Sequence, residues 1–190
     1  FSFARRGNAV TTAGEHSAVS APFAELKTKG IAEPRIAPLL PNGKVDVDKL
    51  LALIDEKTSF VSVMHVNNEM GAINDVNAIA KLIKAKNPRT IFHVDGVQAY
   101  GKLPFRLAKE IDLYSVSAHK IHAPRGAAAL YISGEVIKRK NIVPVMPGGG
   151  QEDGFRSGTE NPDSLLFQLF DGGGDIGPPG NLHIFHSAGG

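Results

Sequence analysis

The feature that most constrains the fold is a repeated alternation of short apolar runs with longer amphipathic stretches. Residues 59–66 form an almost continuous apolar run rich in valine, which is typical of a strand buried on both faces. Residues 75–86 instead carry apolar side chains at intervals of three and four, the spacing of a helix with one buried face. Strands that alternate with helices predict a mainly parallel sheet with helices on both faces, a three-layer α/β fold.

The same pattern extends over most of the chain. Further strands are expected at residues 9–12, 35–39, 90–94, 112–117 and 127–132, and further helices at residues 17–29 and 46–54. We expect one domain over residues 1–170, followed by a glycine-rich tail over residues 171–190 without regular structure. Ligands of such sheets bind beyond the carboxyl ends of the strands, so polar residues that follow each strand are candidates for a functional site.

Composition excludes several classes of function. The 190 residues include no cysteine and carry a net charge of +2, which excludes disulfides, cysteine-ligated zinc and a thiol nucleophile within this chain. No apolar stretch reaches the roughly 18 residues of a transmembrane helix, and no apolar run follows the first charged residues as in a signal peptide. The basic run at residues 138–140 indicates a solvated face or a helix end and not a nucleic-acid patch. We therefore expect a cytoplasmic protein with neither a membrane nor a nucleic acid as partner.

Polar clusters follow three of the predicted strands. Residues 67–71 read Asn-Asn-Glu-Met-Gly, residues 95–98 read Asp-Gly-Val-Gln, and residues 117–120 read Ser-Ala-His-Lys. A fourth cluster lies in a predicted loop at residues 148–159, and His16 precedes the first predicted helix. These clusters are the candidates for chemistry because a parallel sheet would gather them at one edge.

The clusters supply what a pyridoxal phosphate site requires. Such a site needs a lysine for a Schiff base, a carboxylate for the pyridine nitrogen, donors for the phenolic oxygen and the phosphate, and a flat group to stack on the ring. Lys120 directly follows a buried strand, so we expect its amine to be buried. Burial lowers the pKa of a lysine toward that of a usable amine.

Five pieces of sequence together resemble the bacterial cysteine desulfurases of the class V aminotransferase group, from about residue 8 to about residue 169. The pieces are Glu15-His16, Asn67-Asn68-Glu69-x-Gly71, His93-Val94-Asp95-x-x-Gln98, Ser117-x-His119-Lys120, and Gly149-Gly150-Gln151-Glu152 with Arg156-Ser157-Gly158-Thr159. Each piece alone is weak evidence, but all five in this order are specific. The resemblance implies the large domain of a fold-type I pyridoxal-phosphate enzyme.

The resemblance also implies roles at the cofactor ring. Lys120 would form the Schiff base and, with His16, act in catalysis. Asp95 would pair with the pyridine nitrogen, Gln98 would donate to the phenolic oxygen, and His16 would stack on the ring and move protons. Asn67 would lie near the ring oxygen or the substrate.

Three further residues would reach the cofactor phosphate. Ser117 and His119 resemble phosphate ligands within one subunit, and Thr159 resembles a residue that reaches the phosphate of the other subunit. His119 and His122 have no carboxylate or cysteine close in sequence, so we expect no metal site. The glycines at 148–150 do not end in Gly-Lys-Ser/Thr and no Gly-x-Ser-x-Gly motif occurs, which argues against a P-loop and against a serine hydrolase.

The activity implied is the conversion of L-cysteine to L-alanine, with sulfur held as an enzyme persulfide for iron–sulfur cluster and thio-cofactor synthesis. A homodimer and a sulfur-acceptor protein are the implied partners. The chain departs from the family because it is about half the usual length and lacks the catalytic cysteine, so we expect the isolated chain to be inactive. Other class V activities, a selenocysteine lyase or an aminotransferase, and a non-catalytic fragment stay open as alternatives.

Overall fold

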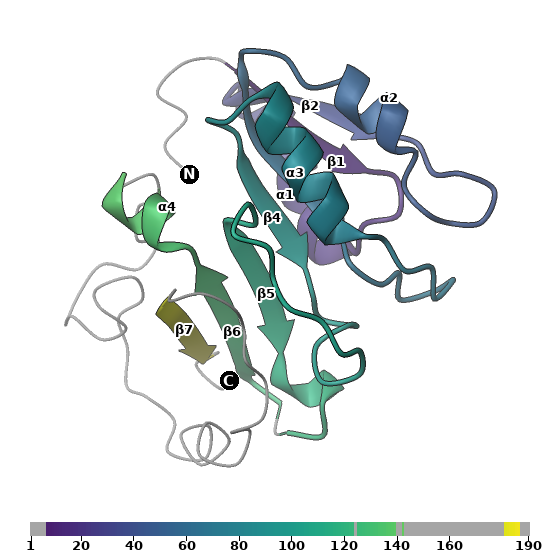
Figure 1. The fold of residues 1–190 in the computed structure, drawn as a ribbon, viewed down its shortest axis with the longest axis vertical. Helices are drawn as coiled ribbons and strands as arrows, with labels where there is room; N and C mark the ends of the chain where they lie inside the picture. The colour runs from purple at the N-terminus through teal and green to yellow at the C-terminus, as the bar shows by residue number, and fades with distance from the viewer. Residues whose placement is uncertain (1–6, 124, 140–141, 143–180, 187–190) are drawn as a thin grey trace.

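The structure is a computed structural model that describes residues 7–123, 125–139, 142 and 181–186 (Figure 1). Its described strands form one seven-stranded sheet in the order β2-β1-β3-β4-β5-β6-β7. The strands from β2 across to β5 are parallel, whereas β6 and β7 each run antiparallel to their neighbour. Their bounds are β1 (Gly7–Thr12), β2 (Ala32–Ala37), β3 (Thr58–Met64), β4 (Ile91–Asp95), β5 (Leu113–Ser117), β6 (Ala127–Ile132) and β7 (Asn181–His186).

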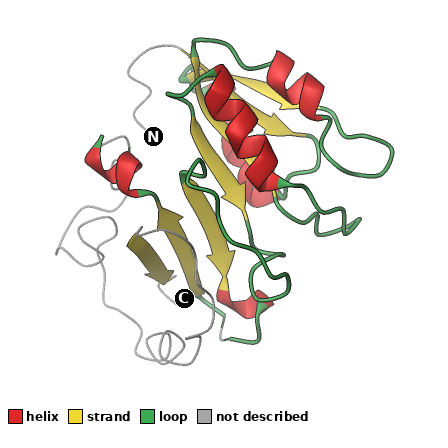
Figure 2. Cartoon of the chain, in the orientation of Figure 1, coloured by secondary structure: helices red, strands yellow, loops and turns green. Residues whose placement is uncertain are grey.

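Helices cover both faces of this sheet. The helices are α1 (Ser17–Thr28), α2 (Val47–Ala52), α3 (Val76–Lys86) and α4 (Gly134–Lys138), with a 3-10 turn, η1 (Ala118–Lys120), after β5. Phe23 of α1 and Val136 of α4 belong with Phe60 to the core on one face. Leu50 of α2 and Ile83 of α3 belong to the core on the other face. The expected three-layer α/β fold with a mainly parallel sheet is therefore confirmed, and Figure 2 shows its strands and helices.

The helix starts follow from side chains that accept hydrogen bonds from the first turn. Asp46 accepts from the backbone N–H of Lys49, and Asp75 accepts from that of Ala78. Short polar side chains at these positions satisfy N–H groups that have no partner inside the helix. The two helices therefore begin one residue after each aspartate, which fits the expected starts within one residue.

The structure differs from the expected elements at β2 and in the tail of the chain. The expected strand at 35–39 is shifted to Ala32–Ala37 although it contains Pro34. Because β2 pairs only with β1 among the described strands, the missing N–H of a proline is tolerated at this edge. Helix α4 ends at Lys138, at the start of the basic run for which a helix end was one of the two interpretations.

The tail also departs from the expectation of no regular structure. Residues 181–186 form β7, which pairs antiparallel with β6 over six residues. The sequence Asn-Leu-His-Ile-Phe-His has a partly alternating polar and apolar pattern that indicates a strand. The prediction of an unstructured tail was wrong for these six residues. The glycines on either side suggested irregular structure and outweighed the short alternating pattern between them.

Candidate active site

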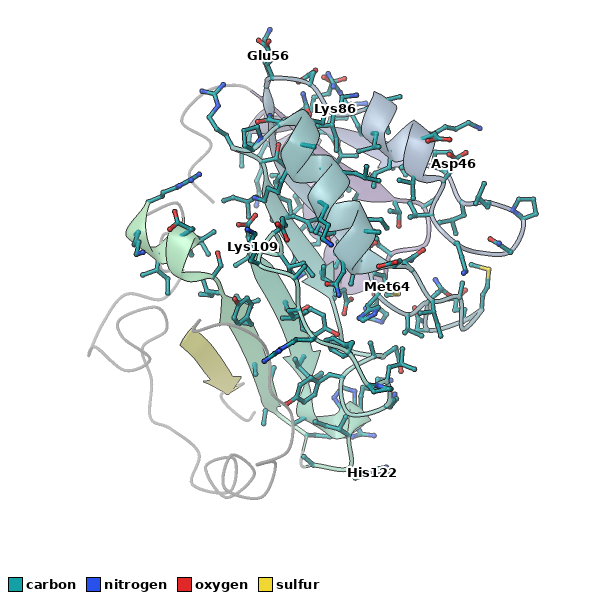
Figure 3. All side chains as sticks on the ribbon, in the orientation of Figure 1. Asp46, Glu56, Met64, Lys86, Lys109 and His122 are labelled. Carbon is teal, nitrogen blue, oxygen red and sulfur yellow. The ribbon has the colours of Figure 1, made fainter. Side chains whose placement is uncertain are left out.

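The sheet topology brings the candidate residues to one edge. Strands β1, β3, β4 and β5 are neighbours and run parallel, so their carboxyl ends lie at the same edge of the sheet. His16 follows β1, Asn67 follows β3, Asp95 ends β4, and Ser117 ends β5. In Figure 3, Met64 marks the carboxyl end of β3 and His122 marks the loop beyond β5. This edge is where ligands of parallel α/β sheets bind.

Asp95 is a buried carboxylate with few bonds. It is 5% exposed, and its Oδ1 accepts one hydrogen bond, 3.1 Å long, from the backbone N–H of Val97. Burial raises the pKa of Asp95, while the Val97 bond and the nearby charge of His16 lower it. A carboxylate in this position would be stabilised by a cationic partner that shares its buried site.

His16 is the N-cap residue directly before α1, and its ring is oriented by a hydrogen bond from the first turn of that helix. The backbone N–H of Ala18 donates to His16 Nδ1 over 3.1 Å. The neutral ring therefore carries its proton on Nε2, on the side away from the helix. The fold brings His16, which follows β1, to the same edge of the sheet as Asp95, which ends β4, although 79 positions separate them in sequence.

The turn after β5 carries Ser117, His119 and Lys120. Ser117 Oγ and His119 Nδ1 share a hydrogen bond of 2.8 Å. The buried Ala118 anchors the turn, and its carbonyl accepts from the backbone N–H groups of Ile121 and Ala123. Lys120 is exposed, so the expectation of a buried amine was wrong. The reason is that Lys120 lies in a single 3-10 turn beyond the end of the strand, not in the strand.

Two amide side chains complete the described part of the site. Gln98 Oε1 accepts from Lys102 Nζ over 2.9 Å, so its NH₂ group is oriented away from that bond. Asn67 Oδ1 accepts from the backbone of Glu69 and Met70, and its Nδ2 donates to the carbonyl of Gly14 over 2.9 Å. Asn67 therefore holds the loop that leads to His16, a contact that the sequence did not indicate.

Glu15 is a residue of this site to which the sequence assigned no role. Its Oε1 accepts from Thr12 Oγ1 over 2.9 Å and from the backbone N–H of Met64 over 2.7 Å. Its Oε2 is buried and has no hydrogen-bond partner among the described residues. Burial, more than any other cause, raises the pKa of Glu15 to about 7. The signals in the sequence were its place between a strand end and His16 and its presence in the Glu15-His16 piece of the family resemblance.

One predicted part of the site falls outside the described residues. Thr159 and the glycine-rich cluster at 148–158 lie outside the residues that the structure describes. Among the residues with described side chains, no group of three or more His, Cys, Asp or Glu is arranged to hold a metal ion. No helix in the described part of the chain is both long and apolar enough to cross a membrane.

Comparison with known proteins identifies the family. The family profile described as aminotransferase class-V matches residues 2–165. The chain belongs to this family. Class-V relatives with similar sequences include the cysteine desulfurase IscS of Vibrio atlanticus, which is 44% identical over 79% of this chain. The mitochondrial cysteine desulfurase of Drosophila melanogaster is 40% identical over 82% of this chain. The chain spans 36% and 33% of the lengths of these two relatives.

Solved class-V structures agree with the fold. A NifS-like protein superposes with a TM-score of 0.79 at 41% identity, over 86% of this chain and 44% of its own. DndA from Streptomyces lividans superposes with a TM-score of 0.72 at 34% identity, over 86% of this chain and 48% of its own. The resemblance to cysteine desulfurases that the five sequence pieces indicated is therefore confirmed.

Proposed function

We propose that this chain is the cofactor-binding part of a pyridoxal-phosphate-dependent cysteine desulfurase, with Lys120 as the lysine that holds the cofactor. The observation that carries the proposal is the gathering of His16, Asp95 and Ser117 at the carboxyl ends of the parallel strands β1, β4 and β5, at one edge of the sheet. Lys120 lies three residues beyond Ser117 in the turn after β5. The cysteine desulfurase names of relatives at 40–44% identity support the same conclusion.

The residues at this edge fit pyridoxal phosphate chemically. The buried Asp95 accepts a hydrogen bond from Val97, so a pyridinium N–H would satisfy a second acceptor position and offset the cost of burying the charge. The hydroxyl of Ser117 and the imidazole of His119 are already paired at 2.8 Å, and both can turn a donor toward a phosphate. His16 offers a flat ring at the same edge of the sheet as Asp95.

Each residue then has a defined task. The bound cofactor would supply an electron sink for bond changes at the substrate α-carbon. Lys120 would hold the cofactor through its amine and exchange the α-proton, and His16 would stack on the ring and share the proton transfer. Asp95 would keep the ring nitrogen protonated, Gln98 would donate to the phenolic oxygen, and Asn67 would lie near that oxygen.

The substrate and partners follow from the same proposal. We take L-cysteine as the substrate and L-alanine as the product, with Thr159 reaching the phosphate in the partner subunit of a homodimer. The chain contains no cysteine, so the thiol that accepts sulfur must lie outside these 190 residues. The proposal also includes a sulfur-acceptor protein as a partner. It places the protein in the cytoplasm, although one similar relative carries the name of a mitochondrial cysteine desulfurase.

The test is an absorbance spectrum of the purified chain mixed with pyridoxal phosphate. We expect an absorbance band at about 420 nm from the imine between the Lys120 amine and pyridoxal phosphate. The band should disappear in Lys120→Ala and persist in Lys81→Ala, which removes an exposed lysine of α3. Reduction with borohydride followed by peptide mass spectrometry should place the added mass on Lys120.

Two results would contradict the proposal. Persistence of the band in Lys120→Ala would show that another amine forms the link. Absence of the band in a wild-type chain that circular dichroism shows to be folded would mean that this chain does not bind the cofactor, as a non-catalytic fragment would behave.

A further inference from the structure

The loop between β1 and α1 carries His16 and is held at three points. The backbone N–H of Ala13 donates to the carbonyl of Ala37 over 2.9 Å, and Asn67 Nδ2 donates to the carbonyl of Gly14. The third point is the side chain of Glu15. Space around the loop is small, since a Cβ on Gly14 would lie 2.9 Å from a methyl of Leu39.

Glu15 joins the ends of two strands through one oxygen. Thr12 is the last residue of β1 and Met64 is the last residue of β3, and both donate to Glu15 Oε1. Glu15 Oε1 thus serves as the acceptor for the backbone N–H of Met64 at the point where β1 has ended and no longer supplies a backbone carbonyl to β3. The bond to Met64 also lies next to Asp95, because Met64 and Asp95 are partners in the β3–β4 register.

The second oxygen indicates the protonation state. Glu15 Oε2 is buried without a partner among the described residues, so an ionised carboxylate would leave half of its charge without hydrogen bonds. Burial is the main cause that opposes ionisation of Glu15; the bonds from Thr12 and Met64 favour ionisation, and the negative charge of Asp95 on β4 opposes it to a smaller extent. Two adjacent buried carboxyl groups rarely both ionise.

We propose that Glu15 is a positioning residue that acts as a neutral acid: it fixes the loop that carries His16 and leaves Asp95 as the carboxylate of the pair that meets the cofactor. The inference rests on the proposed function for its cofactor part. Both donors to Glu15 Oε1 belong to the ends of strands, so we assign Glu15 the role of positioning the loop and not that of binding the cofactor.

The first experiment measures thermal unfolding against pH for the chain without cofactor. The pKa of Glu15 in the folded chain, about 7, lies above its ordinary value of 4.5. The folded state therefore binds the proton of Glu15 more tightly than the unfolded state does. Its contribution to stability is fully present below pH 4.5 and is lost as the pH rises through about 7. Relative to Glu15→Gln, the wild-type melting temperature should therefore fall between pH 4.5 and pH 7 and level off above. If the difference in melting temperature between the wild type and Glu15→Gln stayed constant across this pH range, the assignment of Glu15 as a neutral acid would be overturned.

The second experiment tests positioning with cofactor affinity, read from the absorbance band. Glu15→Gln keeps an acceptor for Thr12 and Met64, so it should retain affinity, whereas Glu15→Ala loses both bonds and should weaken binding about tenfold. In a His16→Ala background, Glu15→Ala should have little further effect, because the loop no longer carries the stacking ring. Additive losses would overturn a role through His16. Absence of binding by the wild type would contradict the proposed function, while the pH profile would still decide the state of Glu15.

Discussion

Replacement of Gly96 by alanine should lower the free energy of unfolding by about 2–3 kcal/mol, the range of an overpacked core. A Cβ on Gly96 would lie 1.9 Å from Cε1 of Tyr114, a distance at which one of the two groups must move. Tyr114 is fully buried, its hydroxyl lies 3.1 Å from His65 Nδ1, and its ring packs at 5.3 Å against Phe105. These contacts hold the ring in place and oppose the shift that an added methyl group would require.

Urea unfolding followed by circular dichroism would measure this loss. Gly30→Ala is the matched control, because Gly30 has a φ of 62° and a Cβ added there would have no atom within 4 Å. Only the backbone conformation then carries a cost, of about 1 kcal/mol. Tyr114→Leu should restore part of the stability of Gly96→Ala, since the smaller side chain vacates the contact. Equal losses in Gly96→Ala and Gly30→Ala would contradict a steric cause.

Replacement of Asp112 by alanine should cost about 3 kcal/mol, the order expected when one partner of a buried ion pair is removed. Asp112 Oδ2 accepts from Lys84 Nζ over 2.5 Å and from the backbone N–H of Phe92 over 2.7 Å. The side chains of Lys84 and Asp112 are 20% and 9% exposed. In the variant the Lys84 ammonium loses its carboxylate partner and keeps its hydrogen bond to the carbonyl of Thr90. The backbone N–H of Phe92 loses its side-chain acceptor.

A double-mutant cycle separates the ion pair from the general cost of mutation. Lys84→Met should remove the stranded charge, so Asp112→Ala should cost less in that background than in the wild type. Glu25→Ala is the comparison for an exposed pair, because Glu25 and Lys29 are 64% and 61% exposed and should contribute little. A loss for Asp112→Ala no greater than that for Glu25→Ala would contradict the role of burial.

Much of the candidate site follows from local sequence. The valine-rich run of β3 and the helical spacing of α3 each require only a few consecutive residues to be recognised, because side chains alternate along a strand and recur every three or four residues in a helix. Asp95 and Ser117 stand at the last position of their strands, and Asn67 stands three residues beyond β3. Parallel strands then bring such positions to one edge, so the edge at which these candidate residues gather was predictable.

The sequence by itself therefore determined the alternation of strands and helices, the mainly parallel sheet and the strand-end residues of the site. The tertiary structure alone decided that Lys120 is exposed, that Glu15 is buried against Met64, and that the ring of Tyr114 occupies the space beside Gly96. The physical reason is that periodicity reports which face of one element is apolar, whereas burial and protonation depend on neighbours contributed by distant segments. Glu15 and Met64 are 49 residues apart, and no local pattern encodes their contact.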